Sequence, residues 1–364
     1  MNVQDVINIL HDLAPLEYAE DFDNVGLLVG DKRQEVSGIL VTLDTLETVV
    51  DEAIAKNCNL IVSFHPIIFK GLKKLTGKTY VERVAIKAIQ NNIAIFSIHT
   101  ALDNAFKGVN SIICNQLGLK NNSILIPQPG TIKKLQTYVP ESDAKKLREA
   151  LFSAGAGNIG NYESCSFNIK GQGTYKGNEN SNPVIGEKGK LHKENEIAIS
   201  VTFKKHLQSN VLKALFETHP YEEVAYEITT LDNKNQHIGM GMIGELETEM
   251  DAISFLNFVK DKMNTECIRH SALLGKSIKK VAVLGGSGSF AISAAKAAGA
   301  DVLVTADLKY HDFFSADGTI VLADIGHYES EQFTKSFLVD YLSKKIPNFA
   351  IILSNTNTNP VKYL

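Results

Sequence analysis

The stretch Ile320-Val321-Leu322-Ala323-Asp324-Ile325-Gly326-His327-Tyr328-Glu329-Ser330-Glu331 joins a strand pattern to a helix pattern. Its first residues form a short apolar run, which is typical of a buried parallel strand. Gly326 ends this run, and apolar residues then recur at helical spacing at Phe333, Phe337, Leu338 and Tyr341. The pattern predicts a strand, a turn and a helix in direct succession, which is the repeating unit of an α/β fold.

His327 and Glu331 are four residues apart, so they share one face of the predicted helix. They follow the carboxyl end of a strand, which is where open α/β sheets bind their ligands. An imidazole and a carboxylate on one face are a natural pair of metal ligands. The alternative is an ordinary polar pair on a solvated first turn, and this stretch alone does not decide between the two.

Two other predicted strands end in the same residue types. The apolar run 60–64 leads to His65, and the run 93–98 leads to His99, with Asp103 four residues further on. Each of these residues, taken alone, is also explained as a polar cap after a strand. Three coincidences are harder to dismiss than one, so we expect these strand ends to meet at one edge of a single parallel sheet. The candidate cluster is His65, Asp103, His327 and Glu331.

His99 and His311 lie close in sequence to this cluster. They are candidates for orienting the ligands or for proton transfer, although polar packing near strand ends explains them equally well. The sequence does not identify a catalytic residue.

The composition indicates an ordinary globular protein of two or three domains. The chain has 364 residues, of which 44% are hydrophobic and 21% charged, with a formal net charge of −4. There is no basic run to support nucleic-acid binding, no secretory signal pattern at the N-terminus and no apolar run near the ~20 residues of a membrane span. We therefore expect a cytoplasmic protein without nucleic-acid or membrane partners.

The four cysteines are scattered and have no C-x-x-C spacing. They stand at positions 58, 114, 165 and 267. This arrangement favours reduced thiols in the core of a cytosolic protein over zinc or disulfide sites.

A different pattern occupies the middle of the chain. After Pro127 and Pro129, strands are expected at 135–139, 165–169, 171–175, 196–202 and 223–228, with helices at 142–154 and 206–217. This β-α-β…β-α-β order within ~100 residues indicates a ferredoxin-like α+β module. We expect it at residues 131–233, inserted into an α/β core formed by residues 1–130 and 234–364.

The segment Gly285-Gly286-Ser287-Gly288 follows a predicted strand and precedes an Ala-rich helix. Such an element suits a phosphate or another anion at a helix N-terminus. The spacing is not a clean G-x-G-x-x-G, so it only weakly supports a dinucleotide site.

Several segments together resemble one family, the GTP cyclohydrolase I type 2 homologues, also called Nif-three-like or dinuclear-metal-centre hexameric proteins. The matching segments run nearly end to end; they are Asp23–Leu27, His65–Gly71, His99–Asp103, His219–Glu223, Gly285–Gly288 and Gly326–Glu331. The middle module resembles the copper-tolerance CutA and nitrogen-regulator PII group. The resemblance implies two α/β halves around a dinuclear metal site and a toroidal homohexamer.

The resemblance also implies a ligand set and one departure from it. His65 matches the second histidine of the family's His-His-Pro motif, and Asp103, His327 and Glu331 match the remaining ligands. The first histidine of that motif is replaced by Phe64, which cannot bind a metal. Either one metal binds tightly and a second weakly, or water takes the place of the missing imidazole.

The implied chemistry leaves two classes of function open. The ligands fit one or two Zn, Fe, Mn or Ni ions per chain, and a metal pair suits hydrolysis of a nucleotide-like or other heterocyclic substrate. The family's name refers to a proposed GTP cyclohydrolase activity. The alternative is a non-enzymatic metal-binding or regulatory assembly protein, and the loss of a ligand at Phe64 favours this alternative.

Overall fold

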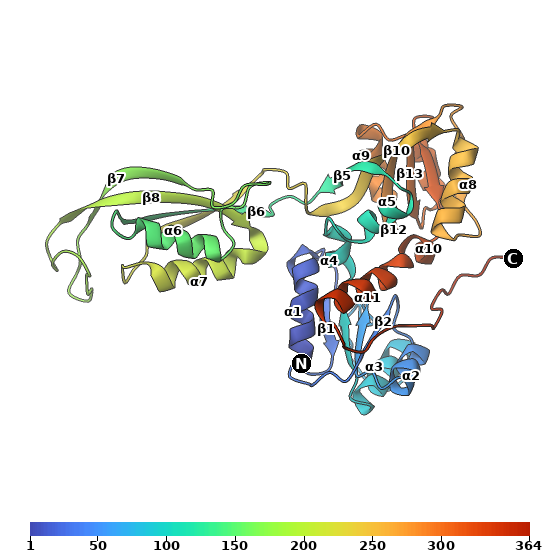
Figure 1. Ribbon diagram of the computed structural model, residues 1–364, viewed down its shortest axis with the longest axis horizontal. Coiled ribbons are helices and arrows are strands. Elements are labelled where there is room, and N and C mark those ends of the chain that lie inside the picture. Colours follow the sequence, from blue (N-terminus) through green and yellow to red (C-terminus); the bar gives the residue numbers. More distant parts are fainter. The chain divides into compact units, whose positions relative to one another are not determined.

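The computed structural model describes residues 1–364, which form two compact units (Figure 1). The first unit comprises Met1–Pro127 and Gln236–Leu364, and the second comprises Gln128–Asn235. None of the helices combines the length and the apolar composition that crossing a membrane requires.

The first unit contains a five-stranded sheet with the order β1-β4-β3-β2-β15. The strands β4, β3, β2 and β15 run parallel, and β1 is antiparallel to β4. The three central strands are buried along their length, as expected for short aliphatic runs covered on both faces. The bounds are β1 Gly26–Val29, β2 Ile39–Thr42, β3 Leu60–Ser63, β4 Ala94–Ser97 and β15 Ile351–Leu353, with helices α1 Val3–Leu13, α2 Glu47–Ala55, α3 Tyr80–Gln90 and α11 Phe333–Lys345.

The first unit also contains a six-stranded sheet with the order β11-β14-β13-β12-β10-β5. Its centre, β12-β13-β14, is parallel, and the flanking strands are antiparallel. The bounds are β5 Lys120–Pro127, β10 Gly239–Met250, β11 Arg269–His270, β12 Ile278–Ser287, β13 Val302–Ala306 and β14 Val321–Asp324, with helices α4 His99–Asn104, α5 Val109–Gln116, α8 Ala252–Met263, α9 Ile292–Ala297 and α10 His327–Glu331. Short 3-10 turns are η1 Leu16–Tyr18, η3 Ser289–Ala291 and η4 Tyr310–Ala316.

The expectation of a single sheet behind all candidate ligands is wrong. Strands β3 and β4 belong to the five-stranded sheet, whereas β14 belongs to the six-stranded sheet. Both sheets contribute to one apolar cluster, in which Val62 and Phe96 join Val304 and Val321. A buried aliphatic strand pairs equally well in either sheet, so its sequence does not record which sheet it enters.

The second unit has the order β-α-β-β-α-β, and its antiparallel sheet has the order β7-β8-β6-β9. This is the ferredoxin-like arrangement. Two expected strands, 165–169 and 171–175, are in fact one continuous strand, because the glycines at 171 and 173 are accommodated within it. The bounds are β6 Ile132–Pro140, α6 Ala144–Ser153, β7 Phe167–Tyr175, β8 His192–Lys204, η2 Lys205–Leu207, α7 Gln208–Thr218 and β9 Tyr226–Leu231.

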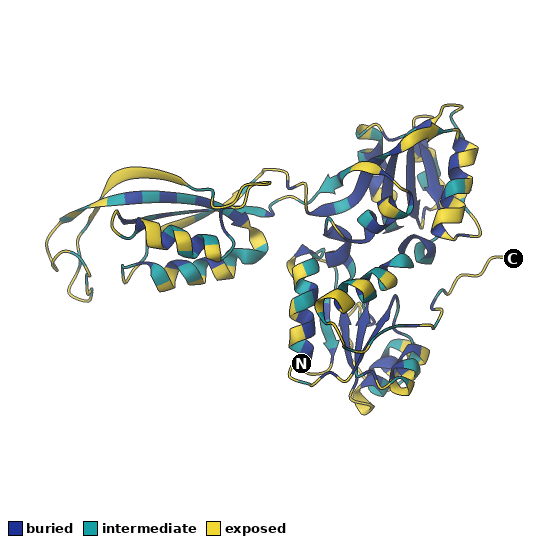
Figure 2. Cartoon of the chain, viewed as in Figure 1, coloured by how far each residue is buried: buried dark blue, intermediate teal, exposed yellow.

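Helices α6 and α7 cover one face of this sheet. Leu147 and Leu151 from α6 and Leu215 from α7 pack with alternate residues of β8, such as Ile197 and Ile199. Strand β7 is exposed along most of its length (Figure 2). The second unit therefore has its own apolar core and one uncovered sheet face.

The expectation that all four cysteines lie in the core is only partly correct. Cys58 and Cys114 are buried, but Cys165 is half-buried and Cys267 is exposed. All four are free thiols. Cysteine spacing carries no information about exposure, which explains the error.

We expect the first unit to fold without the second. Strands β5 and β10 pair with Pro127 opposite Gly239, so the chain leaves and re-enters the first unit at adjacent positions. Replacing residues 128–235 by a short glycine-serine turn should leave a cooperative thermal transition in circular dichroism and should preserve metal binding. Loss of that transition, under conditions where the full chain is folded, would show that the second unit is required.

Candidate metal centre

The three side chains at the centre come from the ends of two strands. His65 follows β3, and His327 and Glu331 lie one turn apart on α10, directly after β14. Gly326 directly precedes α10 with φ +93°, and a Cβ atom there would lie 2.2 Å from a carboxylate oxygen of Glu329. A glycine is therefore required for the chain to turn from β14 into the helix that carries both candidate ligands, His327 and Glu331.

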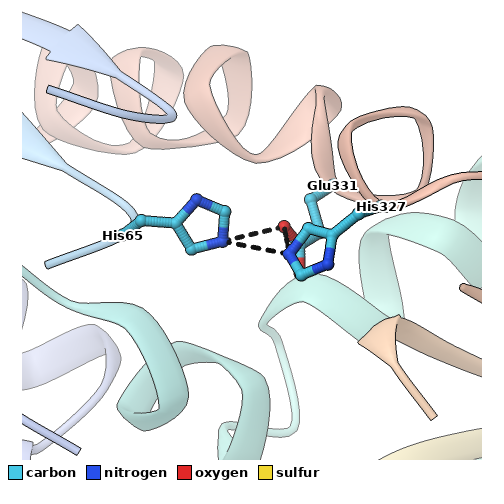
Figure 3. Close-up of side chains that lie close together, drawn as sticks. All are labelled: His65, His327 and Glu331. Atoms are coloured by element: carbon cyan, nitrogen blue, oxygen red, sulfur yellow. Dashed lines mark hydrogen bonds and ion pairs between the residues drawn. The ribbon is translucent and has the colours of Figure 1, made fainter. Parts of the chain in front are cut away.

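Two imidazole nitrogens and one carboxylate oxygen form a small triangle (Figure 3). His65 Nε2 lies 3.0 Å from Glu331 Oε2, His327 Nε2 lies 3.2 Å from the same oxygen, and the two nitrogens are 3.4 Å apart. Ligands that bind a tetrahedral metal at ~2.0–2.1 Å are about 3.3 Å from one another. The triangle thus has the dimensions of one face of a metal coordination shell.

The second nitrogen of each histidine is held by a carboxylate. His65 Nδ1 lies 2.8 Å from Asp44 Oδ1, and His327 Nδ1 lies 2.7 Å from Asp307 Oδ2. Such pairs fix the ring orientation and increase the basicity of the nitrogen that faces a metal. Sequence reasoning assigned no role to these aspartates. They could have been found by the same rule as the ligands, because Asp44 follows β2 and Asp307 follows β13.

The charged side chains in and around the triangle strongly shift one another's pKa values. Burial alone would lower the pKa of both histidines, but the carboxylates raise the pKa of His65 to about 10 and that of His327 to about 11. Burial would raise the pKa of Glu331, yet the two histidines lower it to about 2. A divalent cation that binds here replaces the imidazole protons, so binding releases protons and strengthens as the pH rises.

Asp103 lies near the triangle but does not belong to it. The structure groups only His65, His327 and Glu331 at ligand spacing. Asp103 lies in the last turn of α4, is 8% exposed, and its Oδ1 is buried without a hydrogen-bond partner. Burial, and secondly the Glu331 carboxylate, raise the pKa of Asp103 well above its usual range. Buried polar atoms normally have a partner, and a metal bound at the triangle would supply one to this oxygen. Asp103 is therefore a candidate for a further metal ligand.

The two additional histidines are placed differently. His99 lies beside the centre: its ring is 5.2 Å from that of His65, and its Nδ1 is 2.9 Å from Asp23 Oδ1. His311 is exposed on η4 and contacts the rings of Tyr310 and Phe314. His99 is therefore positioned to act near the centre, whereas nothing in the structure connects His311 with it.

The glycine-rich loop at 285–288 supports Glu331 and is not arranged as an anion site. The amide of Gly286 donates to Ser330 Oγ at 2.9 Å, and the amide of Gly285 donates to Asn110 Oδ1 at 3.0 Å. These internal bonds use the donors that an anion would need. Gly286 has φ +71°, and a Cβ atom there would lie 2.5 Å from Glu331 Oε1. Gly286 is therefore required because the buried carboxylate passes so close to it, whereas a Cβ atom at Gly285 would approach Val109 and one at Gly288 would approach Thr305.

Phe64 is fully buried directly before His65. Its ring centroid lies 4.9 Å from that of His65 and 5.5 Å from that of His99. An apolar ring thus packs against the side of the centre where the resemblance implies a further imidazole.

The fold and the site define an α/β protein with a candidate divalent-metal centre. The model of the Duf34/NIF3 (NGG1p interacting factor 3) family matches residues 1–360, and the chain belongs to this family. A Bacillus subtilis (strain 168) protein named GTP cyclohydrolase 1 type 2 homolog is 36% identical over 371 residues, which cover 100% of this chain and 99% of the relative. A Staphylococcus epidermidis relative with the same name is 35% identical and is covered completely.

Solved structures of relatives share the fold over the full length. A Bacillus cereus protein related to NIF3 is 35% identical, with a TM-score of 0.84, 100% of this chain and 99% of that chain being covered. A Staphylococcus aureus protein is 31% identical, with a TM-score of 0.79 and the same coverage. The α/β core and the inserted ferredoxin-like module are therefore features that this chain shares with its relatives.

Proposed function

We propose that the chain binds a divalent metal through His65, Asp103, His327 and Glu331 and uses it to hydrolyse a nucleotide-like or other heterocyclic substrate. The observation that carries the proposal is the triangle of two imidazole nitrogens and one buried carboxylate oxygen, with sides of 3.0, 3.2 and 3.4 Å. The name of the curated relatives, GTP cyclohydrolase 1 type 2 homolog, supports this substrate class.

The residues around the centre have separable tasks. Asp44 and Asp307 keep the Nε2 atoms of the two histidines directed at the metal. A divalent metal held there polarises a carbonyl or phosphoryl oxygen and lowers the pKa of water. Asp23 holds Nδ1 of His99, which leaves Nε2 of that ring to accept or donate a proton. Burial would raise the pKa of Asp23, but hydrogen bonds from His99 and Thr100 lower it to about 2, so it stays anionic.

A screen with metal-loaded protein tests the hydrolytic part of this proposal. GTP and related purine and pterin heterocycles are incubated with the protein, and products are separated by chromatography. Metal-dependent turnover that is lost in Glu331→Gln supports hydrolysis at this centre. Tight metal binding without turnover of any of these compounds would favour a non-enzymatic metal-binding or regulatory role.

We also propose that the chain assembles as a homohexamer, on the basis of the family resemblance alone. Six chains of 39.9 kDa form a particle of about 240 kDa. Light scattering coupled to size-exclusion chromatography should report this mass at micromolar concentration. A monomer or dimer under these conditions would refute the assembly.

The C-terminal tail should contribute to metal affinity through Asp44. Thr358 is buried, and its Oγ1 donates to Asp44 Oδ2 at 2.6 Å, while Asp44 in turn holds His65. Removal of a residue that hydrogen-bonds a metal ligand typically costs ~10–100-fold in metal affinity. Thr358 is one hydrogen bond further from the metal than such a residue, so its removal should cost less. Thr358→Val should therefore weaken zinc binding by up to about tenfold in a competition titration, and Thr358→Ser should restore it. Equal affinities of all three proteins would exclude a role for the tail.

A further inference from the structure

The second unit contains a cavity of about 730 Å³ on the sheet face that α6 and α7 leave uncovered. Ile169, Gly171, Gly173 and Tyr175 line it from β7, and they alternate along the strand, so they share one face. Glu196 lies opposite Gly171 on β8 and adds a carboxylate to the same face. The cavity volume falls within the ~300–1,000 Å³ that is usual for small-molecule sites.

The glycines of β7 keep the floor of this cavity open. A Cβ atom at Gly171 would meet no atom within 4 Å, so the space above it is empty of side chains. A Cβ atom at Gly173 would lie 2.1 Å from Glu196 Oε2, so any side chain there would displace the carboxylate. Gly173 thus leaves room for the Glu196 carboxylate, and Gly171 leaves open space beside it for a ligand.

Two loops that are distant in sequence close over this floor. The loop after β7 returns at Ile185, whose carbonyl accepts a hydrogen bond from Tyr175 Oη at 2.9 Å. The amide of Asn182 donates to Glu222 Oε1 at 2.6 Å, which joins this loop to the one between α7 and β9. These two hydrogen bonds therefore hold the loops that border the cavity in place.

The lining combines aromatic rings with negative charge. The rings of Tyr175 and Tyr221 meet edge to face at 5.7 Å, and Tyr221 Oη donates to Glu196 Oε1 at 2.8 Å. Burial and the adjacent Glu196 raise the pKa of Tyr221, so its hydroxyl remains a donor. Three glutamates line the cavity, whereas Lys176 is the single basic residue among the lining side chains. Tyrosine faces and carboxylates together favour organic cations.

We propose that this cavity binds a small organic cation with an aromatic or heterocyclic body, whose ammonium group lies against Glu196 beside the paired rings of Tyr175 and Tyr221. The site is separate from the metal centre, because every lining residue belongs to the second unit. It would give the inserted module a ligand-binding role of its own.

The test uses the full chain and three probes of one shape: 1-naphthylmethylamine, 1-naphthalenemethanol and 1-naphthoate. Isothermal titration calorimetry should show that the amine binds at least about tenfold more tightly than the neutral alcohol, and the naphthoate most weakly, because only the amine forms a charged hydrogen bond. Glu196→Gln keeps the acceptor for Tyr221 and removes the charge, so it should abolish the preference for the amine.

A cavity-filling variant provides a second readout that does not alter the charge. Gly171→Val places its side chain in open space and should reduce amine binding at least about tenfold without loss of thermal stability. Gly71→Val is the matched control, since a Cβ atom there also meets nothing within 4 Å and Gly71 lies in the first unit. Equal binding of the three probes, unchanged amine binding in Gly171→Val, or occupation of the cavity by a side chain of a second copy would overturn the proposal.

Discussion

Glu331→Gln is expected to abolish stable metal binding. Glu331 Oε2 is the one atom that faces both His65 and His327, and its side chain is 4% exposed. The amide has nearly the same shape but no charge, so the two imidazoles lose the one anionic oxygen that faces both of them. Loss of a residue that only supports a ligand costs ~10–100-fold in affinity, and loss of a central ligand should cost at least that. Metal per chain, measured by atomic spectroscopy after dialysis, should fall to background.

Glu329→Gln is the matched control for this variant. Glu329 is a second buried glutamate of α10, and its carboxylate accepts a hydrogen bond from Asn359 at 2.9 Å. It does not join the triangle, and glutamine retains an acceptor for Asn359. This variant should keep the metal content of the unmodified protein. Equal metal in the unmodified protein and both variants would remove Glu331 from the site.

Phe64→His is expected to raise the metal content from about one ion per chain toward two. The family resemblance implies a histidine at this position, and the Phe64 ring already packs against His65 and His99. The phenyl ring offers no donor and excludes water from that side of the centre. An imidazole there would restore a ligand for a second metal, and a metal pair should increase any hydrolysis found in the screen.

A control variant must show whether extra metal in Phe64→His comes from the new imidazole or only from looser packing around the centre. Phe64→Leu removes the ring and adds no ligand, so it should leave the metal content unchanged after identical dialysis. Two tightly held ions in the unmodified protein would mean that Phe64 is no handicap. No gain in Phe64→His, with its fold intact by circular dichroism, would mean that a histidine at this position does not reach a metal.

The sequence predicts which side chains form the triangle better than it predicts the sheets. Aliphatic runs located β3, β4 and β14; His65 and His99 directly follow the first two runs, and His327 follows the third after Gly326. The same runs do not show that β14 enters a different sheet, because strand pairing is decided by contacts between distant segments. Strand β5 was also missed, since it begins with the polar residues 120–123, as was the three-residue β15.

The residues that hold the candidate ligands in position were not predicted, for a related reason. Asp44 and Thr358 are 314 residues apart in sequence, and only the fold brings their side chains to 2.6 Å. A lone aspartate after a strand is a common turn residue, so it indicates a metal site only when its histidine partner is known. The segment 285–288 was interpreted as an anion loop because the close contacts of its glycines, such as that of Gly286 with Glu331, involve residues far along the chain.

The most direct test of the metal centre is anomalous diffraction from crystals grown with zinc, with data collected on both sides of the zinc absorption edge. We predict a peak within about 2.0–2.2 Å of His65 Nε2, His327 Nε2 and Glu331 Oε2, with an oxygen of Asp103 as a further ligand. A fully zinc-loaded crystal with no peak at these atoms, or with peaks only elsewhere on the chain, would contradict the assignment.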